Sequence, residues 1–150
     1  MCFTVVAKTK HLPEEWATMR NFFSMNKHDI TTRADVELLV NSFYAKVEQS
    51  ALLGYIFNDI AQVNWEHHLP KMYSFWAGVL LGERTFYGNP MHTHIALSKM
   101  APLTEKEFNE WLQLFTETVD ELFEGTKAEE AKERARNVAK MMLYKIQAAL

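Results

Sequence analysis

Residues 64–82 read NWEHHLPKMYSFWAGVLLG and carry the strongest helical pattern in the chain. Apolar side chains recur every three or four residues, which is typical of a helix with one buried face. These positions are Trp65, Leu69, Met72, Phe75, Trp76, Val79 and Leu80. Gly82 suits the end of a helix, so we expect a helix from Asn64 to about Leu81. Pro70 lies too deep for a first-turn proline and predicts a distorted or late start.

Helical patterns also occur before this segment. Thr31 and Thr32 are favourable N-cap residues, and the next helix is predicted to bury one side. Its inward positions are Val36, Leu39, Val40, Phe43 and Val47. A short helical turn is expected over residues 52–57, closed by Asn58 and Asp59.

The second half of the chain predicts three further helices. A loop over residues 83–90 ends in Asn89-Pro90 and leads into a short helix over residues 91–98. Thr104 and Glu107 form a capping box that opens a strongly amphipathic helix. Gly125 is expected to end that helix.

A second capping box, Thr126 with Glu129, is predicted to open the last helix, which runs to about Ala148. Its inward positions are Ala131, Ala135, Val138, Met142 and Ile146. We find no persuasive strand pattern in the sequence. The expected fold class is therefore all-α.

Residues 1–28 stand apart as an N-terminal extension, and residues 29–150 form the predicted domain. Pro13, followed by Glu14 and Glu15, is typical of a helix start. An apolar stripe could follow along Trp16, Met19, Phe22 and Phe23. We therefore expect the extension to be partly helical.

The composition narrows the function classes. The 150 residues include 16 basic and 19 acidic side chains, for a net charge of -3, which argues against nucleic-acid binding. The single cysteine, Cys2, excludes an internal disulfide and a cysteine cage for zinc or iron–sulfur. No run approaches the roughly 18 apolar residues of a membrane span. The default expectation is a cytoplasmic protein without a membrane or nucleic-acid partner.

Four side chains with polar ends point toward the predicted core from different helices: Tyr44, His68, His94 and Trp111. Burying one such group without a partner costs about 1–3 kcal/mol. A lone inward histidine is commonly a hydrogen-bonded core residue, and inward tyrosine or tryptophan is commonly plain core. Four together on one chain suggest a shared reason.

Other site chemistries have little support. We find no glycine-rich phosphate loop, nucleophile elbow, His-Glu-x-x-His pair or EF-hand pattern, and no Glu-x-x-His pair for a di-iron site. Zinc held by His68, His92 and His94 is an alternative. It is disfavoured because His92 and His94 lie about 160° apart around one helix.

The order and spacing of several motifs from residue 36 to about 147 resemble the truncated haemoglobins, most closely their group III branch. These motifs are Phe43-Tyr44-Ala45-Lys46-Val47, Leu53-Gly54-Tyr55-Ile56-Phe57-Asn58, Trp65-Glu66-His67-His68, Phe75-Trp76-Ala77-Gly78-Val79-Leu80-Leu81-Gly82-Glu83, Tyr87-Gly88-Asn89-Pro90 and Phe108-Asn109-Glu110-Trp111. The resemblance implies a truncated globin fold, a helical sandwich that encloses haem b (iron protoporphyrin IX).

The same resemblance assigns roles to individual residues. It implies that His94 is the proximal iron ligand, and that Tyr44, His68 and Trp111 lie on the distal side and stabilise the bound ligand. Pro70 leaves two expectations for His68, an outward shift or service as a sixth iron ligand. The implied haem contacts are Phe43, Phe57, His68, Lys71, Met72, Phe75, Trp76, Tyr87, His94 and Trp111, with Lys71 and Tyr87 directed to the propionates.

Three hypotheses for function follow. The first is reversible binding of dioxygen, nitric oxide or carbon monoxide, including oxygen transport. The second is catalysis at the same iron, either nitric oxide dioxygenation or peroxidase-like chemistry with His68 as general acid or base. The third is a haem-free helical interaction module. The first two require an unidentified reductase, and we expect a monomer or weak dimer.

Overall fold

The computed structural model describes residues 27–150, and within this range the chain forms helices and no strand. The helices are α2 (Arg33–Gln49), the π-helix η1 (Ile56–Ile60), α3 (Trp65–Leu81), α4 (Pro90–Ser98), α5 (Glu105–Leu122) and α6 (Thr126–Ala149). The expected N-terminal helix lies outside the described residues. None of the described helices combines the length and apolar character needed to cross a membrane.

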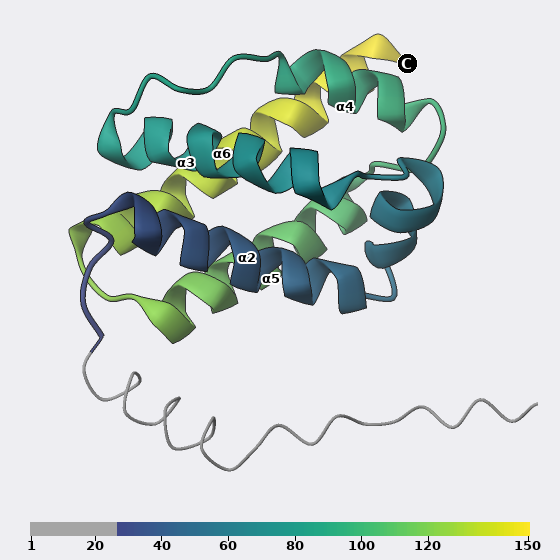
Figure 1. Ribbon diagram of the computed structural model, residues 1–150. Coiled ribbons are helices and arrows are strands. Elements are labelled where there is room, and N and C mark those ends of the chain that lie inside the picture. The colour runs from purple at the N-terminus through teal and green to yellow at the C-terminus, as the bar shows by residue number, and fades with distance from the viewer. Residues whose placement is uncertain (1–26) are drawn as a thin grey trace, which may run out of the picture.

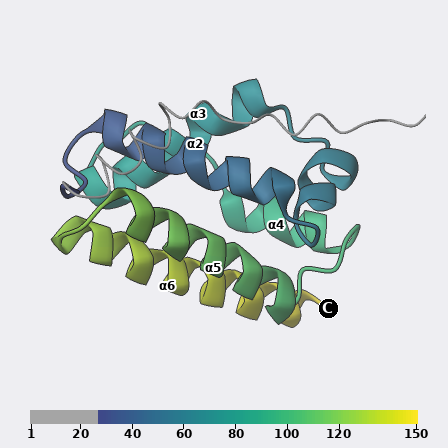
Figure 2. The same ribbon diagram turned by 90° about the horizontal axis from the view of Figure 1, so that it is seen from below.

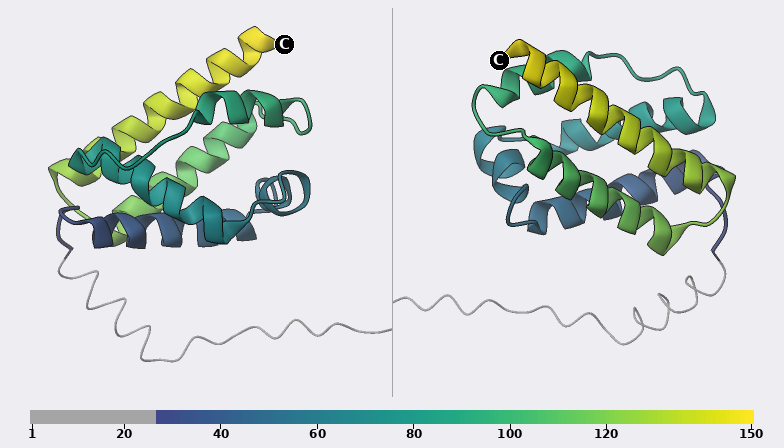
Figure 3. Two further views of the ribbon diagram at one scale, coloured as in Figure 1. Left: turned by 45° about the horizontal axis from the view of Figure 1, so that its top comes forward. Right: turned by 180° about the vertical axis from the view of Figure 1, so that it is seen from behind.

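The helices pack in two layers (Figures 1 and 2). One layer holds α5 and α6 side by side, and the other holds α2 and α3. Helix α4 packs on α6, at the end of the molecule where the chain also winds through η1 (Figure 3). Helix α6 thus contacts both α3 and α4.

A column of aromatic rings joins the two layers. The rings of Trp76 and Phe115 are stacked with centroids 4.6 Å apart, and Trp111 stacks on the other side of Phe115 at 5.7 Å. Phe43 from α2 meets Phe115 edge-on at 5.2 Å. Because Trp76, Phe43 and Phe115 are at most 2% exposed, this column fixes the spacing of α2, α3 and α5.

Helix α3 begins where the sequence predicts, but the expected late start is wrong. The side chain of Asn64 accepts a hydrogen bond from the N–H of Glu66, and Asn64 O accepts from His68 N at 2.8 Å. Pro70 lies inside the helix, with its ring exposed. Proline has no N–H to donate, and its ring crowds the carbonyl of the residue four before it, yet α3 continues through Pro70 to Leu81. It ends at Gly82, whose φ of 72° is left-handed.

Two other predicted features differ from the structure. The turn expected over residues 52–57 continues as the π-helix, so Asn58 and Asp59 lie inside a helix rather than closing one. Helix α5 ends at Leu122, before Gly125, because Phe123 is extended with φ −138° and ψ 156°. Phe123 itself is buried at 3% exposure, which places the chain reversal where this side chain enters the core.

The capping box predicted for the last helix is wrong. Thr126 is the first residue of α6, and its N-cap, Gly125, provides no side chain. The carboxylate of Asp29 takes that role, accepting hydrogen bonds from the N–H groups of Lys127 at 2.9 Å and Ala128 at 2.8 Å. A Cβ on Gly125 would lie 2.5 Å from Asp29 Cγ. Glycine is therefore needed at this approach.

Candidate functional site

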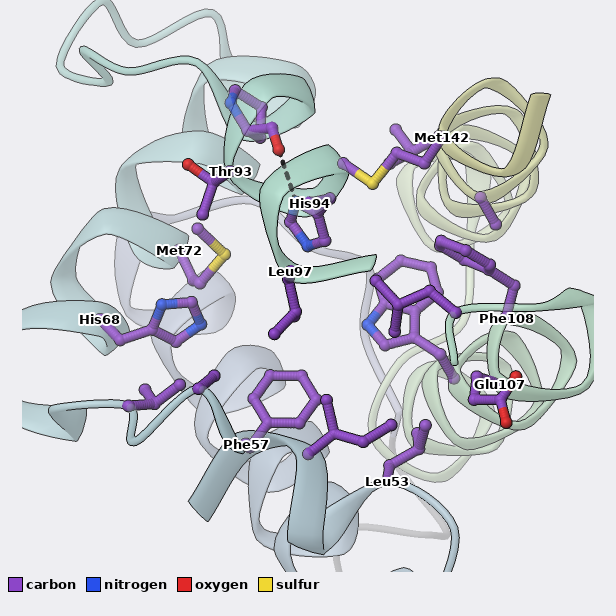
Figure 4. A pocket seen from close by; sticks show the side chains of 18 of the residues that line it. Leu53, Phe57, His68, Met72, Thr93, His94, Leu97, Glu107, Phe108 and Met142 are labelled. Atoms are coloured by element: carbon purple, nitrogen blue, oxygen red, sulfur yellow. Dashed lines mark hydrogen bonds between the residues drawn. The ribbon is translucent and has the colours of Figure 1, made fainter. Parts of the chain in front are cut away.

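A cavity of about 270 Å³ lies between α3, α4, α5 and α6, with η1 at one end. Figure 4 shows His68, Met72, His94, Leu97 and Phe57 projecting into it. Eight of the residues that the sequence analysis selected line this cavity: Tyr44, Phe57, His68, Met72, Phe75, Trp76, His94 and Trp111. The chain thus brings both inward histidines into one largely apolar space.

His94 is oriented by a hydrogen bond within its own helix. Its Nδ1 lies 2.5 Å from the carbonyl oxygen of Pro90 (dashed in Figure 4). A carbonyl only accepts, so Nδ1 carries the proton and the neutral ring keeps its lone pair on Nε2. Burial lowers the pKa of His94, and the bond to Pro90 offsets part of that effect. The ring is therefore held neutral, which is the form that binds metal.

His68 reaches the cavity from α3 and is neutral as well. Burial, followed by the nearby His94 and Lys71 charges, lowers the pKa of His68 to about 4. Its Nε2 is buried and has no hydrogen-bond partner among the described residues. An unpaired buried polar atom costs free energy, so this nitrogen fits a site that a ligand completes.

Two further donors line the same cavity, the hydroxyl of Tyr44 and the indole N–H of Trp111. Tyr44 is 6% exposed, and burial raises the pKa of its phenol, so the hydroxyl keeps its proton. Its ring lies 5.3 Å from that of His68 in an edge-on arrangement. Trp111 is held between Phe115 and the edge of Phe43. These packing contacts fix where both donors can point.

The other three residues implied as cofactor contacts lie elsewhere. Phe43 is buried behind the cavity wall, where it supports Tyr44 and Trp111. Lys71 is exposed on α3, near enough to His68 to affect its pKa. Tyr87 is 87% exposed in the loop before α4, and its hydroxyl donates to Arg84 O. Their contacts with a cofactor remain predictions.

Further residues line the cavity that the sequence analysis did not propose as site residues: Leu53, Ile56, Ala61, Val63, Pro90, Thr93, Leu97, Leu103, Glu107, Phe108, Val138, Ala139 and Met142. Leu97 and Phe108 lie three positions from His94 and Trp111, so the helical spacing of those residues could have identified them. Glu107 is a buried carboxylate, and Thr104 holds it through both its N–H and its hydroxyl. Nothing local marks it as a cavity residue.

The donor groups that line the cavity suit a metal that is already coordinated by a flat organic ring. No group of three or more His, Cys, Asp or Glu side chains within residues 27–150 is placed to hold a metal ion directly. A porphyrin supplies its own equatorial nitrogens and needs only an axial imidazole from the protein. His94, with its lone pair free for coordination, and an apolar lining meet those needs. The chemistry of the residues that line this cavity suits haem.

Comparisons with known proteins agree with this geometry. The sequence model of the bacterial-like globin family matches residues 28–146. Group 3 truncated hemoglobin ctb of Campylobacter jejuni is 32% identical over 125 residues, covering 79% of this chain and 96% of the relative. The crystal structure of a group III truncated hemoglobin from Campylobacter jejuni aligns with a TM-score of 0.69 at 30% identity. That alignment covers 79% of this chain and 94% of the other.

Proposed function

This chain belongs to the bacterial-like globin family, with the all-α truncated globin fold, and on that premise we propose that its cavity holds haem b and binds a diatomic gas. Globins bind such gases at haem iron. Here dioxygen is the proposed principal ligand, with nitric oxide and carbon monoxide as others. An unidentified reductase keeps the iron ferrous.

The observation that carries the proposal is the hydrogen bond from His94 Nδ1 to Pro90 O. It sets the tautomer and the ring orientation together, so that the lone pair on Nε2 would be free to bind the iron. The thioether of Met72 and the rings of Phe75 and Trp76, all on α3, would supply apolar contact to the macrocycle from that side of the cavity. Their role is to exclude water and hold the ring in place.

Tyr44, Trp111 and His68 would supply hydrogen-bond donors to a gas in this cavity. A diatomic ligand that gains negative charge on binding is stabilised by O–H and N–H donors in a low-dielectric space. Tyr44 keeps its proton because burial raises its pKa, and neutral His68 has one ring N–H to give. These donors come from three helices, one each on α2, α3 and α5, and all three line the same cavity.

Absorption spectra of the ferric, ferrous and carbon monoxide forms test the proposal. The full chain loaded with haem should show a Soret band, and His94→Ala should shift or abolish it until imidazole is added. His92→Ala, on the same helix but exposed, is the matched control and should leave the spectrum unchanged. Unchanged axial ligation in His94→Ala would refute the assignment.

Catalysis at the same iron is a second candidate, in the form of nitric oxide dioxygenation or peroxidase-like turnover. It draws on His68 Nε2, a buried nitrogen without a described partner, as the general base that would accept a proton from the reacting substrate and return it later as the acid. Rates with nitric oxide or peroxide should fall at least about tenfold in His68→Ala. Equal rates in the two proteins would exclude that role.

A further inference from the structure

A second hollow lies on the outside of the wall that encloses the cavity. It has a volume of about 510 Å³ and opens between α3, α4 and α6. We call it the outer groove. Phe75, Pro90, Val138 and Met142 line both the outer groove and the cavity. A single layer of side chains therefore separates an occupant of the groove from the site proposed for haem.

One of these shared residues is bonded to the proposed axial ligand. Pro90 contacts the groove, and its carbonyl oxygen accepts the hydrogen bond from His94 Nδ1 at 2.5 Å. The route from the groove to the imidazole is thus one residue and one hydrogen bond long. No other part of the cavity wall described here gives such a link to His94.

Helix α6, which lines one side of the groove, is positively charged along its second half. Residues 134–150 contain Arg134, Arg136, Lys140 and Lys145 and no aspartate or glutamate, in a chain of net charge -3. Arg134 and Met141 line the groove, and Lys145 lies within about 20° of Arg134 around the helix. Arg134 Nη2 lies 3.8 Å from Glu130 Oε1. Within the described residues, Arg136, Lys140 and Lys145 form no ion pair.

The spacing of these charges indicates the size of the occupant. Arg134 and Lys145 are three helical turns apart, about 16 Å along α6, so one small anion cannot meet both. Between them lies Met141, which is 58% exposed. An apolar centre with charged groups around it is the usual make-up of a protein interface. A protein with an apolar contact ringed by carboxylates complements it.

We propose that the outer groove docks an acidic electron-carrier protein that reduces the haem iron through Pro90 and His94. The proposal rests on the proposed function, since it supplies the reductant that gas binding requires. The carrier loses one electron and ferric iron becomes ferrous, with no bond made or broken and no proton moved. Charge attraction of this kind accelerates encounter and weakens with salt.

Stopped-flow reduction of the haem-loaded full chain by fully reduced flavodoxin, a small acidic carrier, tests this. The double variant Arg134→Gln with Lys145→Gln removes two positive charges and should slow reduction of the iron about tenfold at low ionic strength. Arg136→Gln with Lys140→Gln removes the same charge from another face of α6 and should change the rate less than about twofold. Met141→Glu should slow it as well. The differences should vanish near 0.5 M salt, about the range where charges are screened.

Binding gives a readout that does not depend on turnover. Amide resonances of residues 75–79, 90–91 and 134–145 should shift when oxidised flavodoxin is titrated into the full chain. Equal slowing by both charge pairs, or no shifts in these ranges, overturns the proposal. So does occupation of the groove by residues 1–26, by a second copy or by a fatty acid, detected as flavodoxin-independent shifts in the same amides. An intact Soret band in every variant separates these outcomes from failure to bind haem.

Discussion

The carboxylate of Asp29 accepts a hydrogen bond from the N–H of Ala128, 99 residues further along the chain, at 2.8 Å. The same carboxylate accepts from Lys127 and from the N–H of Ile30. It thereby provides acceptors for backbone N–H groups at the start of α6 that have no partner within the helix. Gly125, which has no side chain, cannot provide them. The segment before α2 and the start of the last helix are held together by this one side chain.

Replacing Asp29 with alanine should therefore lower the free energy of unfolding by about 1–2 kcal/mol, as for loss of an N-cap. Urea denaturation followed by circular dichroism measures the change. Asp59→Ala, an exposed aspartate in η1, is the control and should stay within about 0.5 kcal/mol. Equal effects of the two substitutions would contradict a capping role for Asp29.

The charge of Asp29 should also make stability depend on pH. Burial raises its pKa, but hydrogen bonds from Lys127, Ala128 and Ile30 outweigh that effect and leave the pKa below its ordinary value of 3.8. Because the pKa is lower in the folded protein, the charged form stabilises the fold above about pH 4, and this contribution is lost as pH falls through the folded pKa. Asp29→Asn should lower stability at pH 7 and approach wild type near pH 2. A constant difference across that range would count against the lowered pKa.

Gly125→Ala should destabilise the protein by at least about 1 kcal/mol. Its φ of 141° is unfavourable for alanine, and the new Cβ would meet Asp29. The clash involves the Asp29 side chain. The double variant Asp29→Ala with Gly125→Ala should therefore lose less stability than the sum of the losses in the two single variants. Gly88→Ala, where a Cβ meets only the end of the Phe86 ring, is the matched control. If the stability losses of Asp29→Ala and Gly125→Ala simply added in the double variant, backbone strain alone would account for the effect of Gly125→Ala.

Phe115→Ala should lower stability by about 3–5 kcal/mol. Phe115 is 0% exposed and lies between the stacked rings of Trp76 and Trp111. Tyr144→Ala removes an aromatic ring of similar size that is 68% exposed and should be nearly neutral. Thermal or urea unfolding distinguishes them. A loss below about 1 kcal/mol for Phe115→Ala would mean that the column does not hold the layers together.

Tyr44→Phe should raise the dioxygen dissociation rate of the haem-loaded protein about 5- to 150-fold, because one hydroxyl donor of about 1–3 kcal/mol is removed. Flash photolysis measures this rate, and carbon monoxide, a weaker acceptor, should respond less. Tyr55→Phe is the control, since Tyr55 is 38% exposed. An unchanged dioxygen rate would place the Tyr44 hydroxyl outside contact with the ligand.

Much of the helical framework can be predicted from the sequence because its signals are local. Asn64 and Gly82 bound α3, Thr104 and Glu107 open α5, and each acts within a few residues of its own position. The cap of α6 could not be predicted this way, since Asp29 is far away in the chain. The end of α5 was misplaced for a related reason: burial of Phe123, a tertiary contact, decides it.

The site divides in the same manner. Helical spacing was enough to select Tyr44, His68, His94 and Trp111, all of which line the cavity. Spacing gives direction but not depth: it marks Phe43 only as an inward position, and the resemblance adds it as a haem contact, whereas Phe43 lies behind the cavity wall. Glu107 was recognised as a cap, and only the packing of α5 against the rest of the fold brings it to the cavity.

The tryptophans have an optical consequence. Trp76 and Trp111 line the cavity, and the ring of Trp65 lies 5.7 Å from that of His68. All three therefore sit within range for energy transfer to a porphyrin, whose absorption overlaps indole emission. Haem binding should therefore quench the fluorescence of these three tryptophans relative to the folded apoprotein.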